Sequence, residues 1–218
     1  MTDATLIVLA KAPVPGRVKT RLCPPCSPAA AAAIARAALV DTLAAVTATP
    51  GVRPVLVLDG EPGEWVPDAL DIIPQVGGNL ADRLTGAFAA SRGPTVLIGM
   101  DTPQASPTTL RAAVDALLRP GVDAVLGHTL DGGWWIIGLR NPHAAAFAGV
   151  PMSAHDTGHR QAVRLAQLGL RTRELDLEMD VDTFADARTV ANRIPTSHFA
   201  RAVFAVARDL RVEAGVLA

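Results

Sequence analysis

The sequence predicts a layered α/β domain with a mainly parallel sheet, and three observations point to this class. Short apolar runs of strand length recur along the chain. They alternate with longer helical stretches, and loops rich in proline, glycine and aspartate separate the two. With 218 residues, 50% of them hydrophobic, the chain suits one domain with a sizeable core. We therefore expect a single domain over residues 1–218.

The apolar runs have the length and composition of buried strands. They lie at residues 5–10, 52–58, 95–100, 124–129 and 134–139. The last run follows its predecessor so closely that the two strands are not expected to run parallel. Shorter strands are expected near Ile72 and Ile73 and over residues 171–175.

The helices are marked by their starting residues. Ser27-Pro28 and Ser106-Pro107 each place a capping serine before a proline at the first helical position. Asn79 and Asp182 are the expected N-caps of two further helices. Helices are then expected over residues 29–47, 79–91, 107–118, 156–169, 182–193 and 197–212. Ligands bind outside the carboxyl ends of the strands in such sheets, which directs attention to the loops after Ala10 and Met100.

The charge and the apolar patterning exclude several classes of partner. The formal net charge is -1, so no overall field gathers nucleic acid or an anionic membrane. The longest apolar stretches are interrupted before the roughly 20 residues that span a bilayer. No basic segment precedes an apolar core at the N-terminus. We expect a cytoplasmic protein that binds neither nucleic acid nor membrane.

Both cysteines, Cys23 and Cys26, lie in a C-x-x-C pair, which is typical of a redox dithiol or of half a zinc site. The pair lies within a loop rather than at a helix start, and no second pair exists to complete a tetrahedral zinc site. The pattern therefore favours two reduced loop cysteines.

The loop over residues 11–21 holds four basic residues, no acid, and both lysines of the chain, Lys11 and Lys19. The other 18 of the 20 basic residues are arginines. A lysine is a compact charge on a flexible stem, able to follow a phosphate through a reaction. Pro13 and Gly16 stiffen and turn the loop, so that its amides can face an anion. The spacing of Gly16 and Lys19 excludes a P-loop, and no G-x-G-x-x-G follows the first strand.

Several aspartates are candidate ligands for a metal ion. Asp101 follows a buried apolar strand, and Asp180 and Asp182 lie two residues apart, so that an extended chain turns both to one side. Asp101 with Asp182 would offer oxygen ligands to a hard cation and leave room for waters and donor phosphates, as Mg²⁺ prefers. Asp131 precedes Gly132 and Gly133, which suits a turn or a close approach of substrate to the backbone. The alternatives are a turn role for Asp101 and a helix cap for Asp182.

At this point the sequence resembles the DUF2064 proteins of bacteria, small members of the glycosyltransferase type-A superfamily. The most specific matching segment is Lys11-Ala-Pro-Val-Pro-Gly-Arg-Val-Lys-Thr-Arg-Leu22. The other matching segments are Gln75 with residues 77–83, residues 99–103, residues 126–127 with 131–133 and 137–139, and residues 180–183. These segments lie in order over most of the chain. The layout is also similar to that of nucleotidyltransferases that load molybdopterin, phospholactate or sugar acids.

The resemblance implies a three-layer α/β/α sandwich with a mixed, mainly parallel sheet and the nucleotide over its first half. It implies Mg²⁺ or Mn²⁺ on Asp101 and Asp182, with Asp180 beside them. Lys19, Arg17 and Asp101 would be catalytic, and Gln75 and Arg83 would lie near base and ribose. The remaining implied contacts to substrate or nucleotide are Ala10, Lys11, Pro13, Gly16, Arg21, Gly77, Asn79, Asp131, Gly132, Gly133 and Ser153.

Three positions depart from the family pattern. Met100 replaces a small residue and Asn79 replaces an aspartate. Ser153-Ala154-His155 replaces a Ser-Thr pair in the acceptor region, which points to an unusual acceptor. His155 and His159 lie four residues apart, and surface or capping roles are favoured for both.

These features lead to three hypotheses about function. The preferred one is transfer of a nucleoside monophosphate from a triphosphate to a small anionic acceptor, with release of pyrophosphate. The second is glycosyl transfer from a nucleotide-diphosphate sugar, with Asp131 as general base. The third is a nucleotide-binding regulatory module without turnover. The nucleobase, the acceptor and the oligomeric state, with a homodimer as one option, are not fixed by the sequence.

Overall fold

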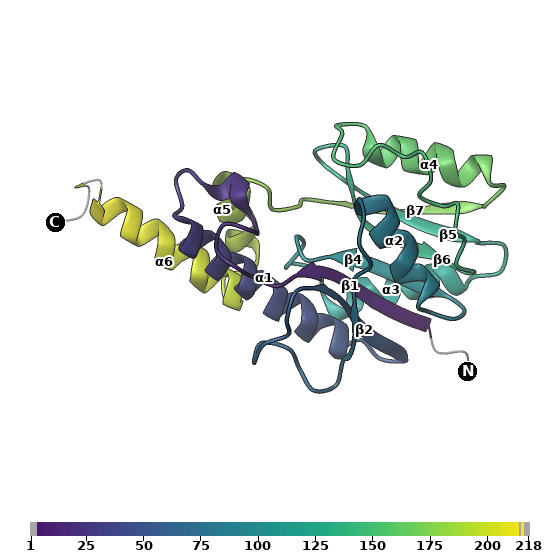
Figure 1. Ribbon diagram of the computed structural model, residues 1–218, viewed down its shortest axis with the longest axis horizontal. Helices are drawn as coiled ribbons and strands as arrows, with labels where there is room; N and C mark the ends of the chain where they lie inside the picture. The colour runs from purple at the N-terminus through teal and green to yellow at the C-terminus, as the bar shows by residue number, and fades with distance from the viewer. Residues whose placement is uncertain (1–3, 214, 216–218) are drawn as a thin grey trace.

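The computed structural model describes residues 4–213 and 215. Strands and helices alternate along the chain as the sequence predicts (Figure 1). The strands are β1 (Ala4–Lys11), β2 (Val52–Asp59), β3 (Asp71–Pro74), β4 (Thr95–Gly99), β5 (Ala124–Thr129), β6 (Trp134–Leu139) and β7 (Thr172–Glu178). The helices are a short 3-10 turn η1 (Thr20–Leu22), α1 (Pro28–Thr47), α2 (Leu80–Ala89), α3 (Pro107–Leu118), α4 (Thr157–Gln167), α5 (Phe184–Arg193) and α6 (His198–Glu213).

The seven strands form one sheet in the order β3-β2-β1-β4-β6-β5-β7. Every neighbouring pair is parallel except the two that involve β6, which runs antiparallel to both β4 and β5. The expected direction of residues 134–139 is therefore confirmed. Because only β6 is reversed, the carboxyl ends of the other six strands and the start of β6 meet at one edge of the sheet.

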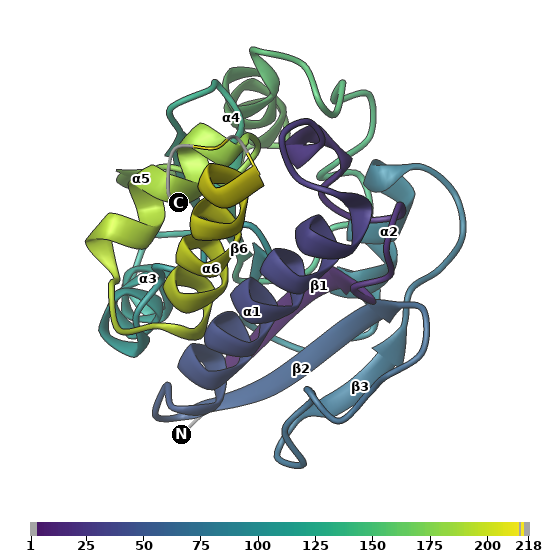
Figure 2. The ribbon, with the colours of Figure 1, turned by 90° about the vertical axis from the view of Figure 1, so that its left-hand side faces the viewer.

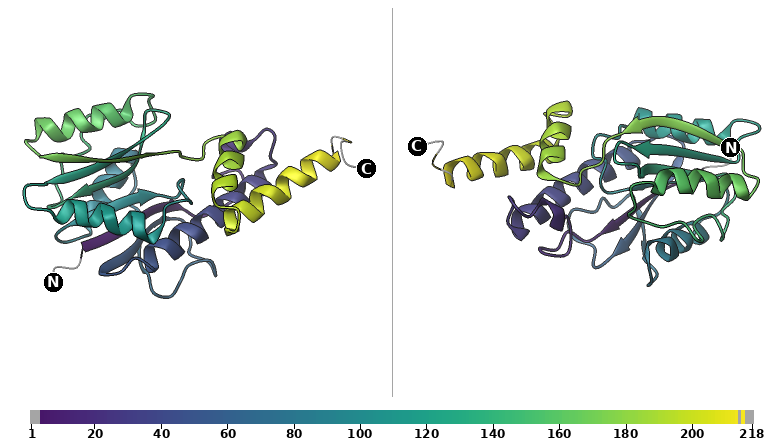
Figure 3. Two further views of the ribbon diagram at one scale, coloured as in Figure 1. Left: turned by 180° about the vertical axis from the view of Figure 1, so that it is seen from behind. Right: turned by 90° about the horizontal axis from the view of Figure 1, so that it is seen from above.

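Helices cover both faces of the sheet, so the predicted three-layer sandwich is confirmed. Alternate residues of β1 face opposite sides: Leu6 and Val8 pack with α1 and α3, whereas Ile7 packs with α2 and α4. Figures 1 and 3 show α2 and α4 on one side of the sheet and α3 on the other.

The long helix α1 is buried on two sides. One side packs on the sheet, and the other forms a third apolar cluster with α5, α6 and the loop that carries Leu22 and Cys26 (Figure 2). By length and composition, α1 is apolar enough to cross a membrane, contrary to the expectation that every apolar stretch is too short. More than half of its apolar window is buried inside the protein, and contact on two sides accounts for an apolar surface all round.

Local capping chemistry sets most helix starts. The side chains of Ser27, Asn79 and Ser106 accept hydrogen bonds from backbone amides three residues ahead, as expected. The expected cap of α5 is wrong: Thr183, not Asp182, accepts from the Asp186 amide, and the Asp186 carboxylate accepts from the Thr183 amide in return. Asp182 is therefore not used by the helix and lies one residue ahead of its cap.

Candidate functional site

A pocket of about 640 Å³ opens at the edge of the sheet where the strand ends meet. This volume lies within the usual range for small-molecule sites. Thirteen sequence-predicted site residues line it: Ala10, Lys11, Arg17, Lys19, Arg21, Gln75, Arg83, Asp101, Asp131, Gly133, Ser153, Asp180 and Asp182.

Five other predicted residues are not part of this lining: Pro13, Gly16, Gly77, Asn79 and Gly132. Two of them have evident structural roles. Asn79 caps α2. Gly132 has a φ of 90°, and a Cβ there would clash with the carbonyl oxygen of His155, so only glycine allows this close approach. Their assignment as direct contacts remains a prediction of the resemblance.

Lys19 lies near the end of the basic loop, residues 11–21, and is held in place there. Its backbone is left-handed, with φ 49° and ψ 38°, directly before η1. Leu22 and Cys26 anchor the loop in the third apolar cluster, so the chain before them is fixed in position. The Lys19 ammonium lies 2.7 Å from the Asp101 carboxylate and donates to the backbone carbonyl of Val181. Only 8% of the Lys19 side chain is exposed, against 43% for Asp101.

This pairing joins three distant segments. The basic loop, the end of β4 and the linker between β7 and α5 meet at one ammonium group. Arg21 adds a second link, since its guanidinium lies 2.5 Å from the carboxylate of Asp182. The sequence identified all of these charged residues, but it expected Lys19 to face phosphates and Asp101 to face a metal ion.

Gln75 and Arg83 form another part of the pocket lining. The Gln75 amide donates to the carbonyls of Ala10 and Val57, and its oxygen accepts from Arg83 at 3.3 Å. Arg83 also donates to the Asp59 carboxylate at 2.8 Å. This hydrogen bond, with the charges of Arg83, Lys11 and Arg17, lowers the pKa of Asp59 below its usual value. Arg83 is thereby fixed beside the basic loop.

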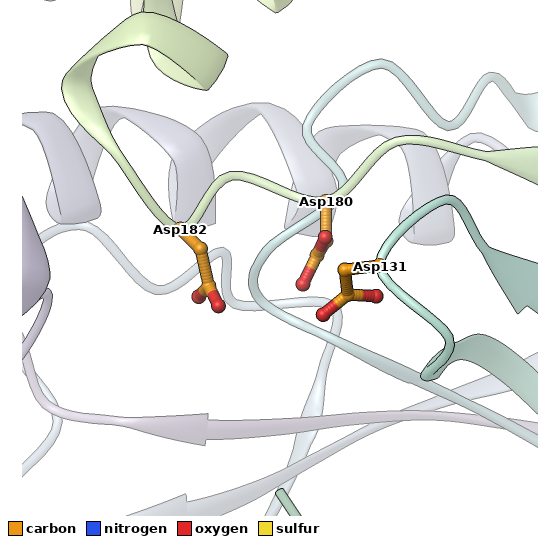
Figure 4. A group of neighbouring side chains, drawn as sticks. All are labelled: Asp131, Asp180 and Asp182. Atoms are coloured by element: carbon orange, nitrogen blue, oxygen red, sulfur yellow. The ribbon is translucent and has the colours of Figure 1, made fainter. Parts of the chain in front are cut away.

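Three carboxylates of the pocket lining lie close together. Asp131 comes from the turn between β5 and β6, and Asp180 and Asp182 come from the linker before α5 (Figure 4). One oxygen from each lies within 4.8 Å of the others. Burial, and then the charges of Asp131 and Asp182, raise the pKa of Asp180 to about 6.

These residues fit a divalent cation. Carboxylate oxygens are the ligands that Mg²⁺ and Mn²⁺ prefer. Burial contributes most to the raised pKa of Asp180, and the charges of Asp131 and Asp182 raise it further while Lys19 opposes them. The structure brings Asp180 and Asp182 together in a possible acidic metal site, with Asp131 as the third carboxylate rather than Asp101. Asp101 as a ligand stays a prediction, because its nearest partner is Lys19.

Sequence reasoning missed part of the pocket. Trp134, Met152 and Thr102 line it without having been singled out, and His155, for which a surface or capping role was favoured, lines it as well. Thr102 is buried, and its hydroxyl has no hydrogen-bond partner within the described part of the chain. A threonine directly after Asp101, and a tryptophan directly after the Gly132-Gly133 turn, were the available signals.

The cysteines lie outside the pocket lining. Cys26 is buried and Cys23 partly buried, and both are free thiols. Burial and the neighbouring Cys23 raise the pKa of the Cys26 thiol, which makes it a weak nucleophile. Two reduced cysteines with a packing role agree with this geometry.

Comparison with known proteins places the chain in a family. The family model described as "Uncharacterized protein conserved in bacteria (DUF2064)" matches residues 42–154, which is just over half of the chain. The chain belongs to the DUF2064 family. No match among curated proteins was found.

This DUF2064 protein is also similar to solved structures. One, from Desulfovibrio desulfuricans G20 and provisionally described as a nucleotide-diphospho-sugar transferase, has 24% identity and a TM-score of 0.82, covering 96% of this chain and 95% of that chain. CMP:2-keto-3-deoxy-manno-octonic acid synthetase complexed with CTP has 13% identity and a TM-score of 0.59, covering 89% and 99%. The 2-C-methyl-D-erythritol 4-phosphate cytidylyltransferase of Thermus thermophilus has 16% identity and a TM-score of 0.57, covering 89% and 100%. These likenesses show the fold that the protein shares with transferases.

Proposed function

We propose that this protein is a metal-dependent nucleotidyltransferase that takes a nucleoside triphosphate as donor and releases pyrophosphate. One observation carries the proposal: the lining of one pocket brings five basic side chains together with a cluster of carboxylates. The basic residues are Lys11, Arg17, Lys19, Arg21 and Arg83. This is the charge distribution that a triphosphate and its counter-ion require.

The number of basic groups favours a triphosphate over a nucleotide-diphosphate sugar. A triphosphate carries more negative charge, and the net charge of the protein, -1, provides no overall attraction for it. The attraction must therefore be local. Lys11 and Arg17 are exposed at the pocket and can turn toward phosphate oxygens, whereas Arg21 is exposed there but paired with Asp182.

Asp131, Asp180 and Asp182 would hold Mg²⁺ or Mn²⁺. Such an ion supplies charge neutralisation of the donor phosphates. The reaction forms a bond between an acceptor oxygen and the α-phosphorus and breaks the bond from the α-phosphorus to the bridging oxygen, so that pyrophosphate leaves. Little covalent chemistry is then asked of the protein. The basic loop orients the triphosphate and stabilises the charge that develops on the leaving pyrophosphate.

Glycosyl transfer remains the second candidate, and one observation favours it. Asp131 is exposed beside Gly133 at the pocket, where a carboxylate could accept the proton of an acceptor hydroxyl. The donor separates the two reactions, because only the triphosphate reaction releases pyrophosphate. The cytoplasmic location, the single domain and the oligomeric state remain predictions of the sequence.

The decisive experiment is calorimetric titration with nucleoside triphosphates and nucleotide-diphosphate sugars, each with Mg²⁺ and with a chelator. We expect at least one triphosphate to bind tenfold or more tightly with Mg²⁺ than without it, and more tightly than the matching nucleotide sugar. Asp182→Asn should lose the Mg²⁺ dependence. Binding of nucleotide sugars alone would favour glycosyl transfer, and absence of any Mg²⁺-dependent nucleotide binding would exclude both reactions.

A further inference from the structure

The basic residues that line the pocket come from one part of the chain. All of its lysines and arginines lie within residues 11–83, and two of them, Lys19 and Arg21, pair with carboxylates of the remaining lining. The rest of the lining comes from residues 97–182 and, in the part of the chain that the structure describes, contains no lysine or arginine. We call this part of the lining the distal half of the pocket.

The distal half has a different chemistry. Trp134 and Met152 provide an apolar surface, Ser153 provides a hydroxyl group, and Asp131, which accepts a hydrogen bond from the buried Thr129, provides a carboxylate. Two arginines close in sequence to His155 do not line the pocket. Arg160 pairs with Asp156 at 2.7 Å, and Arg164 donates to the carbonyl of Ala145 at 2.9 Å.

A bound cation would not make the distal half attractive to a second phosphate. Four carboxylates, those of Asp101, Asp131, Asp180 and Asp182, stand near two basic partners, Lys19 and Arg21. Two negative charges are left, and one divalent ion cancels them. The donor phosphates would then take up the remaining basic side chains of residues 11–83. Proteins recognise phosphate groups with arginine or lysine. The two basic side chains that reach the distal half, Lys19 and Arg21, are already paired with Asp101 and Asp182.

We propose that the distal half binds the acceptor, and that this acceptor is an uncharged or positively charged hydroxyl compound, such as a polyol, a sugar or an amino alcohol. The proposal rests on the proposed function, which places the donor over the basic residues. A sugar or a cationic amine packs on a tryptophan face, and a carboxylate receives hydroxyl or ammonium hydrogens. Trp134 offers the first feature, and Asp131, which needs to give only one of its two oxygens to the cation, offers the second.

This assignment replaces the anionic acceptor expected from the sequence. That expectation gave the basic loop to both substrates, because its charge seemed large enough for a triphosphate and a second anion. In the structure the two loop residues that reach the distal half, Lys19 and Arg21, are already paired with Asp101 and Asp182. No basic side chain is left to face the acceptor.

The test uses pairs of compounds that differ by one phosphate group: glycerol and glycerol 3-phosphate, choline and phosphocholine, glucose and glucose 1-phosphate. Saturation-transfer NMR measures their binding to the protein, with and without Mg²⁺ and an α,β-methylene triphosphate analogue. We expect at least one unphosphorylated compound to bind, and to bind at least tenfold more tightly than its phosphate ester. Tighter binding of the esters, or binding of no compound at all, would overturn the assignment.

Two variants with matched charge show where the compounds bind. His155 is exposed and lines the distal half, whereas His159 is exposed on α4 and is not part of the lining. His155→Arg should raise the affinity for the phosphate esters at least tenfold, and His159→Arg should leave it unchanged. Equal effects of the two variants would place the compounds outside the distal half. Failure of the triphosphate analogue to bind would count against the proposed function alone, since the compounds are also tested without it.

Discussion

Lys19 illustrates how one side chain can serve both the fold and the site. Its ammonium is almost fully buried, lies 2.7 Å from Asp101 and donates to the carbonyl of Val181, next to two of the three clustered carboxylates. Removing it would leave Asp101 and the Val181 carbonyl without their partner. Because Asp101 is 43% exposed, water would recover part of the lost interaction.

We therefore expect Lys19→Ala to lower the free energy of unfolding by about 1–2 kcal/mol, since hydrogen bonds to charged groups contribute about 1.5–3 kcal/mol. Urea denaturation measures the change. Lys11→Ala is the matched control, because Lys11 is exposed in the same loop, and its effect should stay within about 0.5 kcal/mol. Equal effects of the two variants would contradict a structural role for Lys19.

The variant Lys19→Arg tests whether the site needs the shape of the lysine ammonium as well as its positive charge. A planar guanidinium is larger than an ammonium and has little room where only 8% of the side chain is exposed. We expect this variant to keep most of its donor affinity and to lose about a hundredfold in turnover, in line with loss of one charged contact in the transition state. Calorimetry and pyrophosphate release are the two measurements, and full turnover would show that Lys19 is a bystander.

The ionised form of Asp180 is expected to lower the stability of the folded protein at neutral pH. Its pKa is about 6 in the folded state against 3.8 in the unfolded chain, so the folded state holds its proton more tightly. Stability from this group is present below about pH 4 and is lost as the pH rises through 6. At pH 8 the free energy of unfolding of Asp180→Asn should therefore be about 1 kcal/mol higher than that of the parent, a value reduced to allow for partial exposure. Near pH 4 the two proteins should be equally stable.

The measurement is urea denaturation of parent and variant at both pH values without metal. Addition of Mg²⁺ at pH 8 should stabilise the parent and not the variant, since a metal ligand must be ionised. Equal stability of the two metal-free proteins at pH 8 would show that the surroundings of Asp180 do not destabilise its ionised form.

Among the elements, the linker between β7 and α5 contributes two carboxylates to the pocket within three residues. Val181 is buried in the third cluster, and the residues on either side of it, Asp180 and Asp182, both line the pocket. The capping box of Thr183 and Asp186 fixes where α5 begins and thereby where the linker ends. The position of the carboxylates thus depends on a helix cap.

Thr183→Ala should lower the free energy of unfolding by about 1 kcal/mol through loss of this cap. It should also weaken Mg²⁺ binding several-fold, because the linker would no longer be held at its end. Ser106→Ala removes the cap of α3, outside the pocket lining, and is the matched control. We expect it to cost similar stability with no effect on Mg²⁺ binding, as measured by calorimetry beside urea denaturation.

The same elements show which features can be predicted from sequence. Caps such as Ser27 and Ser106 depend on residues three positions apart, and both were predicted correctly. Asp182 and Thr183 are adjacent polar residues, and only the backbone conformation decides which of them caps α5. The pairing of Lys19 with Asp101 and the position of Trp134 in the pocket depend on strand order, which no local pattern contains.

At the scale of the whole molecule, α5 and α6 extend from the sheet and lie with α1 beside the strand ends (Figures 1 and 3). These two helices carry arginines of their own. Arg188, Arg208 and Arg211 line a second hollow between them, away from the pocket residues. The protein therefore offers two groups of positive charge in a chain whose net charge is -1.

This arrangement allows a test of whether donor binding depends on local or on total charge. Lys11, Arg17 and Arg21 can be changed together to glutamine, and Arg188, Arg208 and Arg211 can be changed likewise, which alters the net charge by the same amount. Ions screen exposed charges beyond about 8 Å at physiological salt. The pocket variant should therefore lose at least a hundredfold in affinity for the Mg²⁺ triphosphate, and the helix variant less than twofold. Calorimetry at several salt concentrations should also show a weaker salt dependence for the pocket variant, because it has fewer phosphate contacts to screen. Similar losses in both variants would mean that the pocket binds donors through the overall field of the protein.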